Sequence, residues 1–226
     1  MKSSARITAP LIKFILRRLC RVSFPDEKTL PLKGPYIFAM NHINFLEVPL
    51  IFTHLFPRPV KGLVKHETWK NKFLGFLGES WEAIPIDRKG PSISTMRKVK
   101  EVLDKGEMLL IAPEGTRSKD GSLRQGAPGI VSIAMHSDAR IIPIAHFGGE
   151  KIWLNIKSFR RTRFTIKTGP PFRIKKEMVR TASNRQEAVD EIMIRIAGLL
   201  PHHMRGVYKE REVTDKYISY TGGRGN

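Results

Sequence analysis

A histidine and a carboxylate five positions apart stand early in the chain, in the segment Asn41-His42-Ile43-Asn44-Phe45-Leu46-Glu47. His42 follows an apolar run, and Glu47 falls in the first turn of the helical pattern after it. If Glu47 accepts a hydrogen bond from one ring nitrogen of His42, the other nitrogen can take a proton as a general base. Asn44 and Glu47 also have the spacing of a capping box, so the alternative is that Glu47 only caps its helix.

A second polar motif, A-P-E-G-T-R-S at residues 112–118, directly follows another apolar run. Gly115 permits close approach of the backbone to a ligand, and the hydroxyl of Thr116 can donate to oxygen. The planar guanidinium of Arg117 suits a phosphate. The alternative is an ordinary turn in which Glu114 and Arg117 pair with each other.

Both motifs follow segments that the apolar pattern predicts to be buried strands. Strands alternate with helical patterns along the chain, which predicts an α/β fold with a mixed, largely parallel sheet flanked by helices. We expect strands over residues 36–40, 108–112, 141–146 and 163–168, and helices over 45–55, 92–105 and 183–200. Ser183 and Gln186 have the spacing of a capping box at the start of the last helix.

The composition is strongly basic, with 40 Lys and Arg against 21 Asp and Glu in 226 residues and a net charge of +19. Such a chain favours an anionic partner, which can be a nucleic acid, a membrane or a phosphorylated substrate. The low aromatic content of 8% and the lack of a recognisable RNA- or DNA-reading motif argue against nucleic acid. The single cysteine, Cys20, excludes multi-cysteine metal sites, and no histidine spacing indicates zinc.

The N-terminal segment is both basic and apolar, but no apolar run is long enough to span a bilayer. Read as a helix, it places Arg6, Lys13, Arg17 and Arg21 along one stripe, with most of its leucines and isoleucines opposite. A helix of this kind lies in a membrane interface, with its cations among lipid phosphates. The alternative is a helix packed on the domain with solvated cations.

The two motifs together resemble the glycerophosphate acyltransferase family, specifically the 1-acylglycerol-3-phosphate (lysophosphatidic acid) acyltransferase type. Its first block, N-H-x-x-x-x-D, matches residues 41–47 except that Glu47 stands where the family has Asp. Its F-P-E-G-T-R-S block matches residues 112–118 with Ala112 in place of the aromatic residue. Two further blocks match residues 84–88, which end in Arg88, and the I-P-I strand at residues 142–144.

The resemblance implies an acyltransferase fold and direct transfer of a fatty acyl group to a hydroxyl of a lysophospholipid, chiefly 1-acylglycerol 3-phosphate. It implies no cofactor, because acyl-CoA or acyl carrier protein is the acyl-donor substrate. His42 would be the base and Glu47 would hold its tautomer. The substrate-binding residues it implies are Glu114, Gly115 and Thr116, which shape the acceptor loop, and Arg88 and Arg117, which grip the acceptor phosphate.

We expect residues 1–33 to form the membrane-surface segment, 34–200 the acyltransferase domain and 201–226 a tail. The protein would be peripheral on the cytoplasmic face of a membrane. Residues 151–180 carry ten Lys and Arg against one acid, and their partner would be the membrane, acyl carrier protein or the phosphates of CoA. Two alternatives remain: the same chemistry on glycerol 3-phosphate or another lyso-lipid, and a non-catalytic lipid-binding protein in which Glu47 marks a lost pairing of base and orienting acid.

Overall fold

A computed structural model describes residues 2–44, 46–87, 92–118 and 120–220 of the chain. Its helices are α1 (Ser3–Leu19), α2 (Glu47–Leu55), α3 (Lys72–Ser80), α4 (Ile93–Asp104), α5 (Gly129–Met135), α6 (Ile152–Lys157) and α7 (Ala182–Leu199). Its strands are β1 (Cys20–Ser23), β2 (Tyr36–Met40), β3 (Val60–Lys65), β4 (Ile84–Ile86), β5 (Met108–Ile111), β6 (Arg140–Phe147), β7 (Thr162–Thr168), β8 (Arg173–Ile174) and β9 (Ile218–Ser219).

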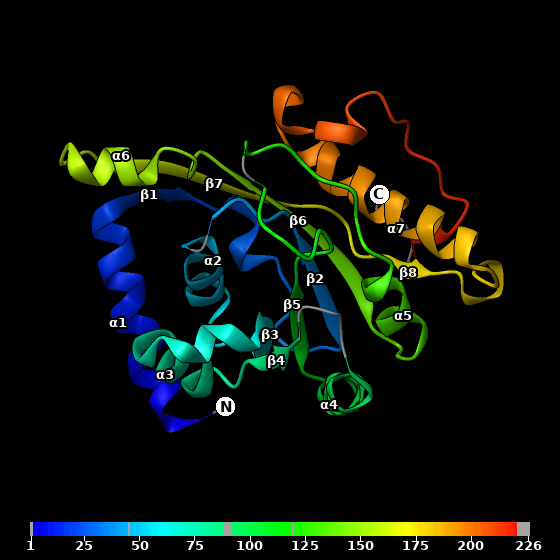
Figure 1. Ribbon diagram of the computed structural model, residues 1–226, viewed down its shortest axis with the longest axis horizontal. Coiled ribbons are helices and arrows are strands. Elements are labelled where there is room, and N and C mark those ends of the chain that lie inside the picture. The colour runs from blue at the N-terminus through cyan, green and yellow to red at the C-terminus, as the bar shows by residue number, and fades with distance from the viewer. Residues whose placement is uncertain (1, 45, 88–91, 119, 221–226) are drawn as a thin grey trace.

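Seven strands form one twisted sheet in the order β1-β7-β6-β2-β5-β3-β4, and β8 and β9 form a separate antiparallel pair. Neighbours in the large sheet are parallel, except that β6 and β7 run antiparallel. Helices α1, α2 and α3 lie on one side of this sheet and α4, α5 and α7 on the other (Figure 1). The predicted α/β fold with a mixed, largely parallel sheet is therefore confirmed.

The central strand β2 shows how the apolar run produces this layering. Its residues alternate between the two faces, so that Ile37 and Ala39 join the core beneath α4, α5 and α7. Phe38 and Met40 join the second core, beneath α1 and α2. A strand buried on both faces must be apolar throughout, which is why this segment lacks the alternation of a surface strand.

The register of β2 sets which loops meet at the carboxyl edge of the sheet. Ala39 lies opposite Ile111 of β5, and Met40 lies opposite Ile144 of β6. Because these three strands are parallel neighbours, the residues that follow each of them emerge side by side.

Helix α1 differs from the predicted basic helix at its end. It stops at Leu19, and the chain continues as β1, which pairs with β7, so that Arg21 lies in a strand and leaves the predicted stripe. Ala5, Ala9 and Leu16 are buried in the core, while another part of the helix surface stays exposed. No helix among the described residues has both the length and the apolar content that crossing a bilayer requires.

The capping box of α7 lies two residues before the predicted one. Thr181 accepts from the backbone N–H of Asn184, and the Asn184 side chain accepts in return from the backbone N–H of Thr181. Ser183 is already helical, and the Gln186 side chain instead donates to Asp190 and to the backbone. At the start of α4, Ser92 caps the helix by accepting from the backbone N–H of Thr95.

Candidate active site

The ends of β2, β5 and β6 bring four polar side chains together. Asn41 and His42 follow β2, Glu114 follows β5, and His146 lies near the end of β6. Asn41 and His146 are joined by three hydrogen bonds of 2.7–3.0 Å, two between the Asn41 side chain and the His146 backbone and one through the imidazole. These contacts hold the loop after β2 against the end of β6.

His42 and Glu47 form the predicted pair. Nδ1 of His42 is in a short hydrogen bond with Oε1 of Glu47. Because an ionised carboxylate only accepts, this contact places the proton on Nδ1 and leaves Nε2 bare. The His42 side chain is 22% exposed, so the ring is partly open to solvent. The pair therefore has the geometry of a general base and its orienting carboxylate.

Glu47 also holds the backbone of the loop that carries His42. Its Oε2 accepts from the backbone N–H of Asn44 at 2.7 Å, and both oxygens lie within 3.1 Å of the backbone nitrogen of Ile43. One half of the capping box is therefore present, because Glu47 accepts from the backbone N–H of Asn44. The other half differs, since the Asn44 side chain accepts from Leu46 and not from Glu47. The carboxylate is completely buried, and the loop wraps around it.

Glu114 connects the second motif to the first. One carboxylate oxygen accepts from the backbone N–H of His42 at 2.8 Å and the other from that of Arg124 at 2.9 Å. The backbone N–H of Ser118 in turn donates to the carbonyl of His42 at 2.8 Å. Burial raises the pKa of Glu114 to about 7, against the lowering effect of the two backbone N–H groups. Both carboxylate oxygens of Glu114 accept from backbone N–H groups, which differs from an ordinary turn in which Glu114 pairs with Arg117.

The middle of the second motif faces solvent, while Ser118 at its end is buried. Gly115, Thr116 and Arg117 are exposed, and the Arg117 side chain is therefore accessible to a ligand. Gly115 has a φ of +64°, and a Cβ placed on it would meet no atom within 4 Å. Within the protein, the left-handed backbone favours glycine here, and the expected close approach of a ligand stays a prediction. Arg88 lies outside the described residues, so its expected role in phosphate binding stays a prediction.

The spacing of residues gives no sign of His146 as part of this site. Its ring is fully buried, its Nε2 is 2.7 Å from the carbonyl oxygen of Asn41, and the same nitrogen is 3.6 Å from Oε2 of Glu47. A polar residue within an otherwise apolar run, the I-I-P-I-A-H-F of β6, is the one signal that could have marked it.

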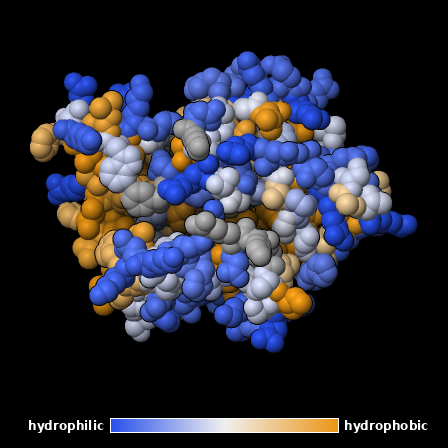
Figure 2. Space-filling model, viewed as in Figure 1, coloured by the Kyte–Doolittle hydropathy of each residue, from blue (hydrophilic) through white to orange (hydrophobic). Residues whose placement is uncertain are grey.

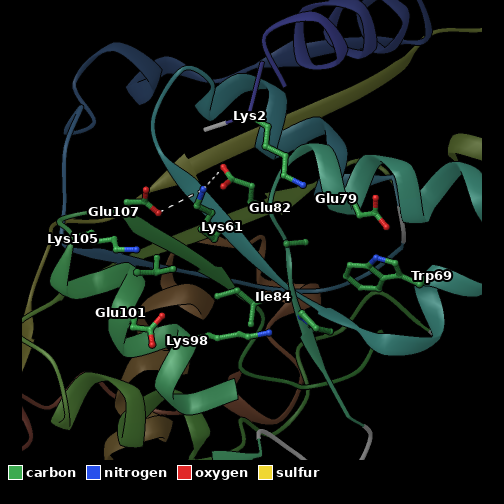
Figure 3. Close-up of a pocket in the computed structure, with 13 residues that line it drawn as sticks. Lys2, Lys61, Trp69, Glu79, Glu82, Ile84, Lys98, Glu101, Lys105 and Glu107 are labelled. Atoms are coloured by element: carbon green, nitrogen blue, oxygen red, sulfur yellow. Dashed lines mark hydrogen bonds and ion pairs between the residues drawn. The ribbon is translucent and has the colours of Figure 1, made fainter. Parts of the chain in front are cut away.

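A separate hollow of about 420 Å³ lies at the opposite, amino-terminal edge of the sheet (Figure 3). Its buried lysine, Lys61, points to Glu82 and Glu107, with nitrogen–oxygen distances of 2.5 and 3.6 Å. None of the candidate catalytic side chains lines it. Within the described ranges, no three His, Cys, Asp or Glu residues gather as a metal site would require.

Comparison with known proteins gives a consistent match. Residues 21–146 match the model of the family described as Acyltransferase. The chain is 29% identical over 144 residues to the 1-acyl-sn-glycerol-3-phosphate acyltransferase of Bacillus subtilis, which covers 63% of this chain and 71% of the relative. It is 27% identical over 135 residues to the chloroplastic enzyme LPAT1 of Arabidopsis thaliana, with 58% and 37% covered. The chain thus spans little more than a third of that longer relative.

A solved structure shares the fold. The crystal structure of the 1-acyl-sn-glycerophosphate (LPA) acyltransferase PlsC from Thermotoga maritima superposes with a TM-score of 0.63 at 18% identity. The match covers 86% of this chain and 79% of that one. The fold that carries the His42–Glu47 pair is therefore shared over most of the chain, well beyond the two motifs.

Proposed function

Because the chain belongs to the acyltransferase family, we propose that it transfers a fatty acyl group from an acyl thioester to the hydroxyl of a lysophospholipid in phospholipid biosynthesis. The observation that carries this proposal is the His42–Glu47 pair, with its bare Nε2 at the carboxyl edge of the sheet. The names of the matched relatives support 1-acylglycerol 3-phosphate as the acceptor. Acyl-CoA or acyl carrier protein serves as the donor.

The reaction needs one base and no covalent enzyme intermediate. Nε2 of His42 takes the proton of the acceptor hydroxyl as its oxygen attacks the thioester carbonyl. Glu47 supports the imidazolium that forms. When the tetrahedral intermediate collapses, the carbon–sulfur bond breaks and the leaving thiolate takes the proton from His42. The products are the new ester and a free thiol.

Thiol release is the direct test of this chemistry. The wild type is expected to release thiol from acyl-CoA or acyl-loaded carrier protein when 1-acylglycerol 3-phosphate is added. His42→Ala should lower kcat about 100- to 10,000-fold, the usual contribution of a general base. His136→Ala, which removes an exposed histidine at the end of α5, is the matched control and should keep wild-type activity.

Each alternative has its own outcome in this assay. A higher kcat/KM with glycerol 3-phosphate or another lyso-lipid would change the acceptor but keep the chemistry. If no acceptor elicits thiol release while the protein still binds lipid vesicles, a non-catalytic lipid-binding role replaces the enzyme. Full activity of His42→Ala would overturn the assignment of the base.

The finer proposal concerns where the protein works, and it rests on the surface of α1. Ile7, Leu11, Phe14 and Ile15 are exposed and fall along one face of this helix, separate from the face that packs on the core. The helix has no acidic residue, and Arg18 stacks on Phe14. Exposed apolar side chains beside cations fit an anionic membrane interface, such as the cytoplasmic leaflet.

The segment 151–163 extends this surface. Trp153, Leu154 and Phe159 are exposed there, among five basic residues and no acid. The Arg161 guanidinium donates to the carbonyls of Arg17 and Cys20, which holds this segment against the end of α1. Figure 2 shows hydrophobic residues gathered at that end of the molecule, the left side of the view, where Figure 1 places α1 and α6. Apolar side chains beside cations match an anionic lipid interface, so we take lipid, and not an acidic carrier protein, as the partner of this segment.

Vesicle binding with a matched pair of variants tests the membrane surface. Leu154→Ser should weaken binding to vesicles containing phosphatidylserine about tenfold, because a leucine side chain contributes roughly 1.5 kcal/mol when buried. Val213→Ser changes an equally exposed aliphatic residue outside this surface, at 62% against 60%, and should bind as the wild type does. Equal binding of both variants, or binding of acyl carrier protein that Leu154→Ser weakens, would contradict the proposal.

A further inference from the structure

The ring of His146 lies against the carboxylate that the proposed mechanism uses. Nε2 of His146 is 3.6 Å from Oε2 of Glu47 and 2.7 Å from the carbonyl oxygen of Asn41. Because a carbonyl oxygen only accepts, Nε2 carries the proton of the neutral ring. The N–H therefore donates to the carbonyl of Asn41, and Oε2 of Glu47 lies close enough to the same nitrogen for an electrostatic contact but too far for a hydrogen bond.

The fold holds this ring in place. The imidazole is stacked on Phe164 of β7, with ring centroids 5.4 Å apart and planes 10° apart. Its backbone exchanges two hydrogen bonds with the side chain of Asn41. The ring has no solvent exposure, and both neighbours belong to the sheet or to its edge. His146 therefore has little freedom to turn its Nε2 away from Glu47.

The ring is held at an energetic cost. Its second nitrogen, Nδ1, is buried and has no hydrogen-bond partner among the described residues. An unpaired buried polar atom costs about 1–3 kcal/mol, and an apolar residue at this position in the core would avoid it. A polar ring that is retained at this cost indicates that its Nε2–H provides something that an apolar side chain would not.

What Nε2–H provides follows from the surroundings of Glu47. Oε1 serves His42, while Oε2 accepts from the backbone N–H of Asn44 and faces His146. The backbone N–H groups of Ile43 and Asn44 both donate to the carboxylate of Glu47, but both belong to the loop that carries His42. His146 is a residue of the sheet whose ring nitrogen lies 3.6 Å from the carboxylate.

Resting on the proposed acyl transfer, we propose that His146 is a positioning residue. Its Nε2–H, which donates to the carbonyl of Asn41, attracts Oε2 of Glu47 electrostatically and so favours the orientation in which Oε1 meets Nδ1 of His42. This N–H also places the positive end of a bond dipole near the carboxylate. Glu47 is one methylene longer than an aspartate, and a longer side chain has an additional torsion to restrain. His146 restrains it from the sheet side.

Kinetics of three variants distinguish positioning from packing. His146→Phe keeps a stacked ring but removes the donor, and we expect kcat to fall about 10- to 100-fold with little change in the KM of the thioester. His146→Gln keeps an N–H donor and should recover most of that loss. His54→Phe is the control, because it replaces another buried histidine, which bonds only the backbone of α2. It should leave kcat unchanged.

The pH profile supplies a readout that packing alone would not move. The charged or titratable groups around Glu47 are His42, His146 and Glu114. With His146→Phe the carboxylate supports the His42 imidazolium less well, so the acid limb of the profile should move to lower pH. If His146→Phe keeps the wild-type kcat and profile, or if His146→Gln is as impaired as His146→Phe, the proposal fails.

A measurement without substrate separates this proposal from the enzymatic function. The Nδ1–H proton of His42, in its short bond to Glu47, should give a downfield NMR resonance in the wild type and in His54→Phe. In His146→Phe it should move upfield or broaden. A resonance that does not move overturns the positioning role even if thiol release is observed, and a shift in a protein without thiol release would refute only the enzymatic function.

Discussion

The backbone N–H of His42 donates to Oε1 of Glu114 at 2.8 Å, so a side chain of the second motif holds the proposed base, which lies in the first motif. The two residues are far apart in the sequence and adjacent because β2 and β5 are parallel neighbours. Glu114 is buried and holds the backbone of His42 and Arg124 through its two carboxylate oxygens. It therefore differs from the exposed Arg117 three positions later, although both belong to one motif.

Removal of the Glu114 carboxylate should destabilise the protein. Glu114→Ala leaves the N–H groups of His42 and Arg124 without their acceptors, and the expected loss is about 3 kcal/mol in the free energy of unfolding. Urea denaturation at about pH 4.5, at the lower end of the range in which Glu114 titrates, measures it. Glu101→Ala removes a carboxylate on α4 that is 57% exposed and should change the free energy by less than about 0.5 kcal/mol. Equal effects of the two variants would contradict the buried contacts of Glu114.

The pH dependence of stability should carry the signature of Glu114. Its pKa is about 7 in the folded protein, above the ordinary value of 4.5, so the folded state favours the protonated form. The stability that Glu114 contributes is therefore fully present below about pH 4.5 and is lost as the pH rises through about 7, by about 3 kcal/mol in all.

Comparison with Glu114→Gln isolates this contribution, because glutamine does not titrate. The free energy of unfolding of the wild type minus that of the variant should fall steadily between pH 4.5 and pH 8. Chemical denaturation in a series of buffers at constant ionic strength gives both values. A difference that stays constant, or that grows with pH, would show that the carboxyl group is not destabilised by burial.

Shortening Glu47 should lower activity even though aspartate is the residue of the family pattern. The loop backbone lies 2.7–3.1 Å from the longer carboxylate, and Glu47→Asp would withdraw the oxygens from the Ile43 and Asn44 N–H groups. A displacement near 1 Å costs about 100-fold in kcat. Steady-state thiol release measures it, with Glu187→Asp on the surface of α7 as the control. An increase in kcat would mean that the loop adapts to either acid.

The sequence could predict the pair of His42 and Glu47 because both residues lie within one short segment with a recognisable strand and helix around it. It could also predict β2, β5, β6 and β7, since each is an apolar or alternating run bounded by turn residues. These are local patterns, and the parallel arrangement followed from the alternation of strands and helices.

Other parts of the site depend on contacts that no local pattern contains. His146 reaches Glu47 only because β6 pairs with β2, and its spacing from the first motif carries no information about that pairing. Two competing caps within a few residues, Thr181 and Ser183, cannot be ranked by spacing alone. Helix α1 has apolar residues on a packed face and on an exposed face, and the sequence alone does not distinguish the two. Its contacts with α2 and α3 decide which face is covered.

Arg117 should act on the acceptor and not on the donor. It is exposed at the edge that carries His42, and a guanidinium binds phosphate through charge-assisted hydrogen bonds of about 1.5–3 kcal/mol. Arg117→Ala is therefore expected to weaken the apparent affinity for the phosphate-bearing acceptor, raising its KM about 10- to 100-fold, with less than about a twofold change for the thioester. Arg97→Ala is the control, because it removes an exposed arginine on α4. It should change neither the KM of the acceptor nor that of the thioester. If Arg117→Ala raised the KM of acyl-CoA instead, Arg117 would bind the phosphates of the donor, and the acceptor phosphate would need another cation.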